Sequence, residues 1–364
     1  MVLDPGNLAR LIRHVPRGEI PQSEDLLSAT MLAERLAVEG DGPFDLLVGG
    51  DVMLGGRTEP ILSQNGATYP FGAIDPLLRH SEVVLANLEG PLARRAERAD
   101  TARNFSYRVQ PATAKTLAQV GIDVVTLANN HLVDCGREGV VETLRALEEA
   151  QIASVGAGAD IRGAHRPVIR KTRGGRLGIL GYYWNRRCAA TECHAGSAMD
   201  DPAALAADIV ALRNQVELLL VTFHWGIPYE RVPSQADREK ARLAVDLGAD
   251  IVVSHHPHVI QPFEIYRGCP IFYSVGNLTF GSGNSRAEGM LVGARFDDNH
   301  LEVDVFPLYV KNRDPRVAYQ PKVLTGRAGA RVLRNLAAMS GDYGGLLQVK
   351  PWCARLRLQR RGRE

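Results

Sequence analysis

Residues 218–226 read LLLVTFHWG, an apolar run that ends in a histidine and a turn. Both faces of this run are apolar, which is typical of a strand buried in a parallel sheet. A second run of this kind, IVVS at 251–254, is followed by three histidines, His255, His256 and His258. Helical segments separate such runs along the chain, and strands that alternate with helices predict βαβ units.

The same alternation extends outward from these two runs. We expect further strands at 45–52, 82–87, 123–128, 153–156 and 176–182, and helices at 111–120, 138–150, 202–214 and 235–247. After Pro262 the rhythm becomes β-rich, and the runs FEIYR, PIFYSVGN, GMLVGARF and LEVDVFPLYV predict antiparallel hairpins. An α/β half joined to a β-rich half predicts an α/β fold with two sheets packed face to face and helices outside.

Composition excludes several classes of protein. Forty-three basic residues against 41 acidic ones leave a net charge of +2, which gives no reason to expect nucleic acid or an anionic membrane as a partner. The run GGDVMLGG lacks the Gly-Lys-Ser/Thr ending of a phosphate-binding loop. No apolar run in the first forty residues reaches the ~7–15 residues of a signal-peptide core or the ~20 of a membrane span. Five scattered cysteines favour a reducing compartment, so we expect a cytoplasmic protein without a membrane span.

Changes in composition divide the chain into three parts. Residues 1–43 are expected to form a helical extension, with a short amphipathic turn around Leu8, Leu11 and Ile12 and a helix over 25–38. Residues 44–311 hold the alternating runs and form the main domain. Residues 312–364 are polar and basic, and are expected to form a solvated terminal helix or arm, or to contact an anionic partner.

Five of the apolar runs end in side chains that can bind a metal ion. These side chains are Asp51, Asn87, Glu89, Asn130, His131, Asp134, His224, His255, His256 and His258. Ligand sites in α/β sheets form beyond the carboxyl ends of the strands, so the five loops are expected to converge on one crevice. The donor set combines carboxylate, imidazole and amide oxygen without thiolate, which suits Mn, Fe or Zn. One or two ions are expected, and two would need a bridging carboxylate, from Glu89 or Asp51.

Six ordered segments resemble a known family. They are GDVMLGG (50–56), NLEGPL (87–92), LANNHLVDCG (127–136), FHWG (223–226), SHHPHVIQPFE (254–264) and YSVGNLTF (273–280). They resemble the CapA, or poly-γ-glutamate biosynthesis protein, family, which is similar in fold to the calcineurin-like metallophosphoesterases. The resemblance covers residues 44–307. It implies a four-layer α/β/β/α sandwich with a metal centre at one sheet edge.

The resemblance also implies roles for individual residues. One metal site would use Glu89, Asn130, His224 and His256, and a second would use Asp51, Glu89 and His258. Met53 stands where the metallophosphoesterase motif has a histidine ligand, which leaves the second site one ligand short. His131, in the segment that matches Gly-Asn-His, would be a general acid or a phosphate contact.

Several neighbouring residues have two interpretations. Asp134 either accepts a hydrogen bond from His131 or caps the helix that begins near Gly136. Asn87, Trp225, Tyr229 and His255 are expected to line the substrate pocket, and Asn277 either lines it or forms a turn. An arginine group either forms a solvated helix face or binds an anionic substrate; its members are Arg94, Arg95, Arg98, Arg103 and Arg108. Cys188, Cys193 and His194 either are loop residues or form a metal or redox site.

We expect a metal-dependent hydrolase that cleaves a phosphoester or a γ-glutamyl amide in a small-molecule or oligo-γ-glutamyl substrate. The family name implies γ-glutamyl chemistry, whereas the fold relatives imply phosphoester chemistry. The alternative is a non-catalytic accessory protein in γ-glutamyl polymer or secondary-metabolite biosynthesis. The sequence does not predict the oligomeric state.

Overall fold

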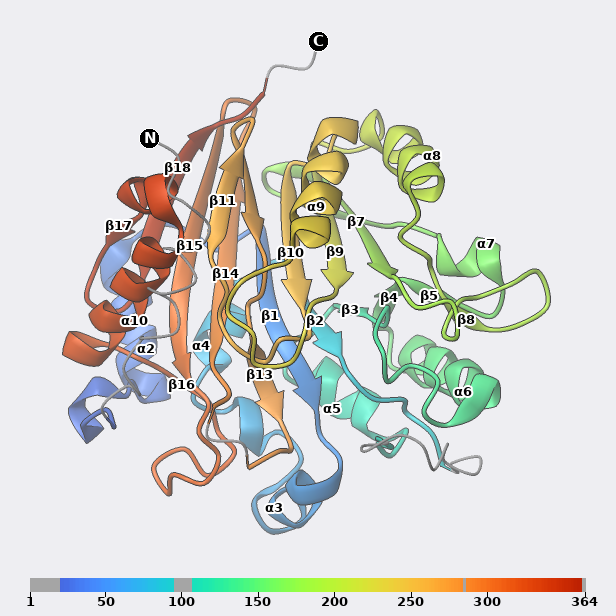
Figure 1. Ribbon diagram of the computed structural model, residues 1–364. Coiled ribbons are helices and arrows are strands. Elements are labelled where there is room, and N and C mark those ends of the chain that lie inside the picture. The colour runs from blue at the N-terminus through green and yellow to red at the C-terminus, as the bar shows by residue number, and fades with distance from the viewer. Residues whose placement is uncertain (1–19, 95–106, 284–285, 362–364) are drawn as a thin grey trace.

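A computed structural model describes residues 20–94, 107–283 and 286–361 of the chain (Figure 1). It contains a ten-stranded and a six-stranded sheet and a small two-stranded ladder. The strands of the ten-stranded sheet are β1 (Leu46–Met53), β2 (Val84–Leu88), β3 (Val124–Thr126), β4 (Ala153–Val155), β13 (Asn277–Phe280), β14 (Gly289–Phe296), β15 (His300–Tyr309), β16 (Lys322–Val323), β17 (Gln348–Val349) and β18 (Ala354–Gln359). Those of the six-stranded sheet are β6 (Val168–Thr172), β7 (Gly175–Tyr183), β9 (Leu218–His224), β10 (Ile251–His255), β11 (Phe263–Tyr266) and β12 (Cys269–Phe272). The ladder pairs β5 (Ala157–Gly158) with β8 (Gly196–Ser197).

The helices lie outside the two sheets, except the last one, whose Leu333 and Leu336 pack with the residues between the sheets. They are α2 (Ala29–Glu39), α3 (Glu59–Asn65), α4 (Asp75–Arg79), α5 (Thr113–Gln119), α6 (Gly136–Glu149), α7 (Ile161–Ala164), α8 (Pro202–Arg213), α9 (Gln235–Leu247) and α10 (Gly326–Met339). None of the helices in the described ranges is both long and apolar enough to cross a membrane.

Both sheets are mixed, with the order β17-β18-β15-β14-β1-β2-β3-β4 in the larger and β11-β12-β10-β9-β7-β6 in the smaller. β1 to β4 run parallel, as do β7, β9, β10 and β12. The hairpins β11/β12 and β14/β15 are antiparallel. The predicted change from βαβ units to hairpins after Pro262 is therefore confirmed.

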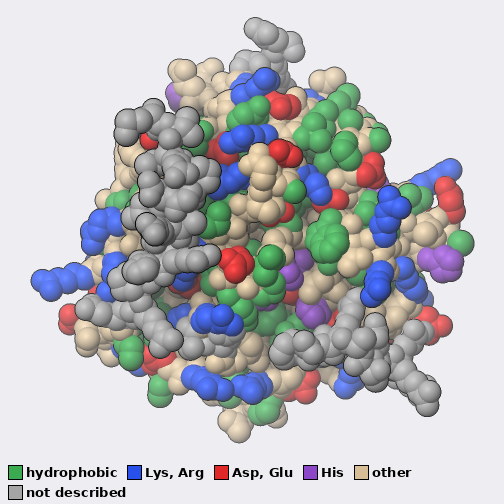
Figure 2. Space-filling view, viewed as in Figure 1, with side chains coloured by type: hydrophobic (Ala, Val, Ile, Leu, Met, Phe, Trp, Pro, Cys, Tyr) green, Lys and Arg blue, Asp and Glu red, His purple; other side chains and the backbone are tan. Residues whose placement is uncertain are grey.

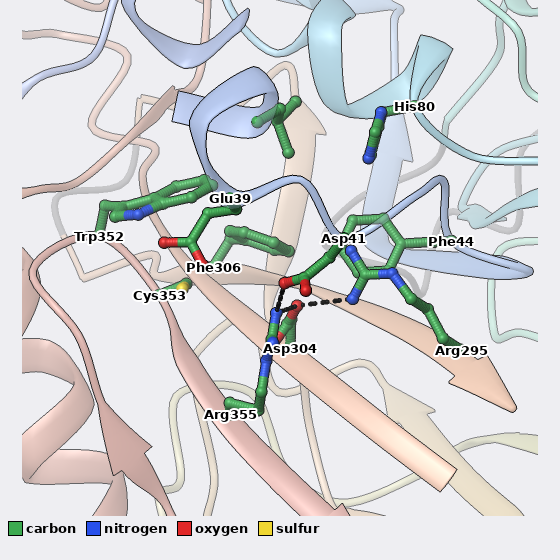
Figure 3. A pocket seen from close by; sticks show the side chains of 11 residues that line it. Glu39, Asp41, Phe44, His80, Arg295, Asp304, Phe306, Trp352, Cys353 and Arg355 are labelled. Carbon is green, nitrogen blue, oxygen red and sulfur yellow. Dashed lines mark hydrogen bonds and ion pairs between the residues drawn. The ribbon is translucent and has the colours of Figure 1, made fainter. Parts of the chain in front are cut away.

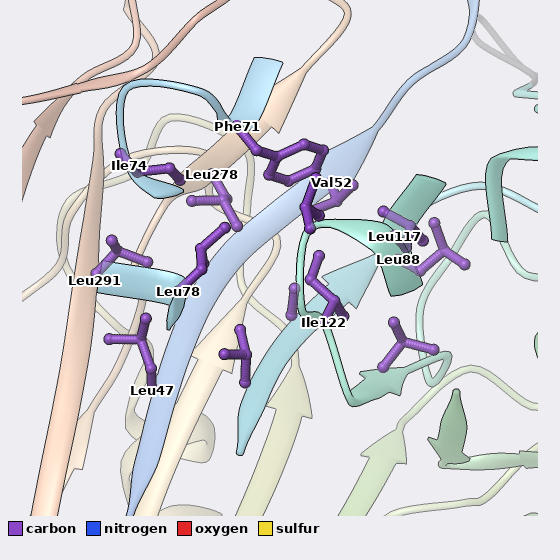
Figure 4. Close-up of a cluster of buried hydrophobic side chains, with 14 of the residues drawn as sticks. Leu47, Val52, Phe71, Ile74, Leu78, Leu88, Leu117, Ile122, Leu278 and Leu291 are labelled. Atoms are coloured by element: carbon purple, nitrogen blue, oxygen red, sulfur yellow. The ribbon is translucent and has the colours of Figure 1, made fainter. Parts of the chain in front are cut away.

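Alternation along each strand divides the core into layers. On β9, Leu218 and Leu220 pack between the sheets, whereas Leu219 and Val221 pack against α8 and α9. On β1, Leu46 lies between the sheets and Leu47 faces the helices on the other side, in the cluster drawn in Figure 4. That outer cluster also holds apolar side chains of α2, α4, α5 and α6. The layers are thus helix, sheet, sheet, helix, which confirms the expected α/β/β/α sandwich.

The segment after Pro262 differs from the prediction in one respect. The run PIFYSVGN was expected to form one strand, but the chain leaves the smaller sheet after Phe272 and enters the larger one at Asn277. Gly276 makes the crossing possible, because its φ is +67° and a Cβ there would lie 2.1 Å from the Glu288 carbonyl oxygen.

The expected basic C-terminal arm is also wrong for most of its length. β18 pairs with β15 over six residue pairs, from His300↔Gln359 to Val305↔Ala354. Leu333 and Leu336 of α10 are buried with the residues between the sheets. The polar composition of residues 312–364 did not predict this packing, because the basic Arg355 is buried and paired with acidic residues of the sheet.

The N-terminal extension is likewise packed onto the main domain. Leu32 and Leu36 of α2 are buried in the outer core cluster, and the Leu27 N–H donates to the Val323 carbonyl at 3.0 Å. The expected turn at 8–12 lies outside the described residues.

Candidate metal centre

The carboxyl ends of strands from both sheets meet on one side of the sandwich. β1, β2 and β3 end there from the larger sheet, and β9 and β10 from the smaller (Figure 1). The register sets Asp51 beside Asn87, and His224 beside His255. The strand ends that the sequence singled out therefore share one edge, and histidine side chains reach the surface near the middle of the face in Figure 2.

Five side chains at this edge form what we call the Glu89 cluster: Asp51, Glu89, His224, His256 and His258. They fall into two groups that share Glu89, one with His224 and His256, the other with Asp51 and His258. Within each group the potential ligand atoms lie within 4.8 Å of one another. These groups coincide with the two sites that the resemblance implied, apart from Asn130.

The Glu89 carboxylate lies at the centre of the arrangement. Its Oε1 is 3.9 Å from Nε2 of both His224 and His258, and 3.8 Å from Nε2 of His131. The residue is fully buried, and neither carboxylate oxygen has a hydrogen-bond partner among the described residues. Such a group is costly to bury, because a charge removed from water must be paired.

A divalent cation fits these atoms. Two ligands each about 2.1 Å from an ion can lie up to about 4.2 Å apart, and the 3.9 Å separations of His224 Nε2 and His258 Nε2 from Glu89 Oε1 are within that limit. They are too long for hydrogen bonds. A bound cation would balance the carboxylate charge that no described residue neutralises by hydrogen bonding.

Asparagine side chains fix the orientation of the possible ligands. Asn87 Nδ2 donates to Asp51 Oδ1 at 2.8 Å and lies 3.3 Å from Nδ1 of His224. The other nitrogen of that ring, Nε2, lies 2.7 Å from Asn130 Oδ1. Asn130 Oδ1 and His224 Nε2 thus meet on the Glu89 side, as a shared metal site would require.

Asn129 is a structural residue to which sequence reasoning gave no role. Its Nδ2 donates to Asn87 Oδ1 at 3.1 Å and to the Leu88 carbonyl at 2.9 Å, while its Oδ1 accepts from the His131 N–H at 3.1 Å. It therefore ties the end of β2 to the loop after β3. The signal was its position directly before Asn130 and His131 in the matched segment.

His131 and Asp134 form a close pair beside the Glu89 cluster. His131 Nδ1 lies 2.6 Å from Asp134 Oδ2, which also accepts a hydrogen bond from the Tyr107 N–H at 2.7 Å. Cys135, not Asp134, occupies the position before α6, and its side chain makes no capping hydrogen bond. Of the two interpretations of Asp134, the hydrogen bond to His131 is the one present.

Burial sets the protonation of the histidines. It lowers the pKa of His255 and, with the neighbouring His258, that of His256, each to about 4. Burial and then His256 lower the pKa of His224 well below its usual value. The rings of His224 and His256 are thus neutral near pH 7, the form in which imidazole binds a metal.

The acidic residues respond differently to the same burial. Burial and then Asp51 raise the pKa of Glu89 well above its usual value. Burial alone would raise the pKa of Asp51, but His258, whose Nδ1 is 2.9 Å from Asp51 Oδ2, lowers it. Burial opposes protonation of His258, yet Glu89 and Asp51 raise its pKa to about 9. In the metal-free chain, a proton on His258 therefore supplies part of the missing positive charge.

The histidine loop has an unusual backbone. His256 has a φ of +99° and His258 a φ of +56°, a region that residues other than glycine seldom adopt. Strain of this kind costs of order 1–3 kcal/mol per residue and persists where the surroundings enforce it. Here the result is that both rings point into one cluster from positions two residues apart.

The remaining candidates are placed as follows. Asn277 Oδ1 lies 2.8 Å from His258 Nδ1, and the Tyr229 ring centroid lies 5.9 Å from that of His258. His255 Nδ1 is 3.7 Å from Asp51 Oδ1, outside the two groups of possible ligands. Met53 Sδ accepts a hydrogen bond from the Gly55 N–H at 3.2 Å.

Trp225 does not line the site, contrary to expectation. It is buried against the outer helices, stacked on Phe223 at 4.5 Å, and its indole N–H donates to the Tyr273 carbonyl at 3.3 Å. The physical reason is alternation along the strand, which turns residues 223 and 225 away from His224.

The described members of the cysteine and arginine groups are not among the possible ligands of the Glu89 cluster. None of the five cysteines, all of which lie in the described ranges, is in a disulfide; Cys193 lies near His194 on an exposed loop, whereas Cys188 is buried. Arg94 is exposed and pairs with Glu142 at 3.6 Å. Arg108 is also exposed and donates to the Arg94 carbonyl, while Arg95, Arg98 and Arg103 lie outside the described residues.

A third acidic group lies elsewhere, at the junction of the N-terminal segment with β15 and β18. This Asp304 cluster contains Asp41, Glu302 and Asp304 together with Arg295 and Arg355. Figure 3 shows its members other than Glu302. Arg355 donates to Asp304 at 2.6 and 2.7 Å and to Asp41 at 2.6 Å. Arg295 donates to Asp304 at 3.0 Å and to Glu302 at 3.2 Å. The two guanidinium groups supply the positive charge, so the acids need no metal.

Comparison with known proteins matches this chain to a bacterial family, to relatives of known name and to solved structures. Residues 45–282 match the family described as bacterial capsule synthesis protein PGA_cap. The capsule biosynthesis protein CapA of Bacillus anthracis is 33% identical over 279 residues, which cover 73% of this chain and 67% of that protein. A probable polyglutamine synthesis accessory protein of Mycobacterium tuberculosis is 30% identical over 279 residues, covering 64% of this chain and 73% of that protein. Among solved structures, a 5'-nucleotidase from Candida albicans gives a TM-score of 0.43 at 10% identity, over 76% of this chain and 54% of that one.

Proposed function

This chain belongs to the bacterial capsule synthesis family matched by residues 45–282, and from that premise we propose that it is a metal-dependent hydrolase. Its substrate would carry a phosphoester or a γ-glutamyl amide bond. One observation carries the proposal: the buried Glu89 carboxylate has no hydrogen-bond partner in the described chain and lies within 3.9 Å of Nε2 of His131, His224 and His258.

The residues that would hold the metal fall into the two groups already described. Glu89, His224 and His256 with Asn130 would hold one ion, and Asp51, Glu89 and His258 would hold a second. An ion of Mn, Fe or Zn supplies Lewis acidity toward a phosphoryl or carbonyl oxygen and lowers the pKa of water.

The chain's own residues orient the substrate and move a proton. Asp134 accepts from Nδ1 of His131, which fixes the ring and leaves Nε2 directed toward Glu89. From that atom His131 can donate a proton to a leaving group, and Asp134 stabilises the charged ring. The rings of Tyr107 and Phe280 pack beside His131 and His258 and limit the access of water to them.

The alternative is a non-catalytic accessory protein in γ-glutamyl polymer synthesis. Met53 favours it, since this side chain stands where a histidine ligand would complete the second site and its sulfur accepts a backbone hydrogen bond. The word "accessory" in the name of the Mycobacterium tuberculosis relative also favours it.

Elemental mass spectrometry and a hydrolysis assay would separate the two functions. The purified protein would be loaded with Mn²⁺ or Zn²⁺ and given a chromogenic phosphomonoester, a phosphodiester and a γ-glutamyl anilide. We expect one or two ions per chain and turnover of at least one substrate, both lost in His256→Ala and kept in His194→Ala, which alters an exposed histidine outside the cluster. Bound metal without turnover of any substrate would favour the accessory role, and no bound metal would contradict the hydrolase.

A further inference from the structure

Two tyrosines from distant parts of the chain lie beside the Glu89 cluster. The Tyr107 ring centroid is 4.2 Å from that of His131 and 5.8 Å from that of Phe280. Gly90, directly after Glu89, leaves room for it, since a Cβ at Gly90 would lie 3.3 Å from the Tyr107 Cβ. Tyr107 is therefore seated on the His131 side of the cluster by packing and by its N–H bond to Asp134.

Tyr229 lies on the His258 side and has a guanidinium group over its ring. Its φ is +67°, and its N–H donates to the Pro257 carbonyl at 2.7 Å, which ties it to the histidine loop. The Arg286 guanidinium carbon lies 4.2 Å from the Tyr229 ring centroid, within cation–π range. Glu288, nearby, is bound by Arg231 at 2.5 and 2.8 Å, so its negative charge is balanced.

The Tyr107 phenol is placed to donate a hydrogen bond. Its hydroxyl makes no hydrogen bond to any described residue, and the side chain is only half-buried. Burial, then Glu89 and then Tyr229, raise the pKa of this phenol, so the hydroxyl keeps its proton at neutral pH. Packing alone does not account for the hydroxyl, because phenylalanine would stack on His131 equally well.

We propose that Tyr107, Tyr229 and Arg286 form a recognition subsite for an oxyanion group of the substrate, with Tyr107 as the neutral donor and Arg286 as the cation. This inference rests on the proposed function, since it names the class of group bound at that metal centre. Phosphate and carboxylate both meet the chemical requirement, because each presents negatively charged oxygen acceptors to N–H and O–H donors. The subsite thus selects anionic substrates, whichever bond is cleaved.

Titration calorimetry on the Mn²⁺-loaded full chain tests this subsite. Inorganic phosphate and γ-glutamylglutamate would be the two probes, and they distinguish a phosphate from a carboxylate source. We expect Tyr107→Phe and Arg286→Gln each to weaken binding of one probe about tenfold or more, the effect of removing a hydrogen bond to a charged group. Tyr69→Phe is the matched control: this tyrosine is also half-buried, its hydroxyl bonds to no described residue, and it should bind the probe as wild type does.

Metal content measured on the same samples keeps the outcomes separate. Weakened probe binding at unchanged metal content in Tyr107→Phe and Arg286→Gln supports the subsite. This holds even if the wild type hydrolyses no substrate, because the absence of hydrolysis would contradict only the proposed hydrolase activity. Hydrolysis with unchanged probe affinity in both variants overturns the subsite alone. Failure of the metal-loaded wild type to bind either probe overturns it as well.

Discussion

The Glu89 cluster and the Asp304 cluster both gather carboxylates within a few ångströms, but they differ in burial and in the source of positive charge: Asp51 and Glu89 are fully buried, whereas Asp41 and Glu302 are half-buried. In the Asp304 cluster, Arg355 and Arg295 come from the chain itself and bind the acids at 2.6 to 3.2 Å. In the Glu89 cluster the nearest partners are imidazoles, and most of these are held neutral by burial. The first cluster is complete as a structural element, whereas the second holds a fully buried carboxylate, Glu89, that has no hydrogen-bond partner in the described chain.

The largest expected effect comes from removing the central carboxylate of the Glu89 cluster. Glu89→Gln keeps the shape of the side chain but removes the charge shared by both candidate sites. Hydrolysis should fall about a thousandfold or more, because a metal ligand underlies several kcal/mol of transition-state stabilisation, and bound metal should fall with it. The free energy of unfolding of the metal-free protein, measured with urea, should not decrease, because the variant no longer buries an unpaired charge. Unchanged metal content would contradict the assignment.

The opposite result is expected in the Asp304 cluster. Arg355→Met leaves Asp304 and Asp41 without their main partner, so the free energy of unfolding should fall by about 3–5 kcal/mol. Metal content should stay at the wild-type value. Urea unfolding and elemental analysis would measure the two quantities, and stability equal to that of the wild type would show that Arg295 alone balances the acids.

A smaller effect is expected beside the Glu89 cluster. Asp134→Asn keeps the shape but removes the charge that stabilises a protonated His131. The turnover rate should fall about a hundredfold, the lower end for a general acid, while metal content stays constant. Steady-state kinetics would measure it, and a parallel loss of metal would instead indicate that Asp134 supports the ligands.

The smallest effect tests whether burial explains the stability of the Asp304 cluster. Arg357 contacts Glu302 at 3.0 Å, but 64% of its side chain is exposed. Arg357→Gln should change the free energy of unfolding by about 0.5 kcal/mol or less. A loss of unfolding free energy comparable to that of Arg355→Met would show that the number of ion pairs, and not their burial, determines how much the Asp304 cluster stabilises the fold.

Much of the fold was predictable because apolar runs and helical segments alternate regularly. β18 was missed because its sequence, ARLRLQ, alternates leucine with arginine and was treated as part of a basic tail. Its buried Arg355 is tolerated only because Asp304 and Asp41, more than fifty and three hundred residues away along the chain, neutralise it. Partners so distant cannot be inferred from local composition.

The convergence of strand ends was predictable at the site, since parallel strands bring their carboxyl ends to one edge. Tyr107 carried no such signal, because its role depends on contacts between loops, and the signal for Asn129 was only its position directly before Asn130 and His131. Trp225, by contrast, was assigned wrongly despite available information: strand alternation sets it opposite to His224. Phe223 and Trp225 are two residues apart and therefore share a face of the strand, so the alternation could have placed Trp225 in the core.

The position of β1 between β2 and β14 also matters during synthesis. Asp51 leaves the ribosome roughly 200 residues before His258, an interval of about 10–40 s at ~5–20 residues per second. Until β13 and β14 are made, one edge of β1 has no partner strand, and an unpaired edge is a template for association with other chains. The nascent chain therefore exposes this edge of β1 for longer than a chain whose central strands pair only with their immediate neighbours in sequence.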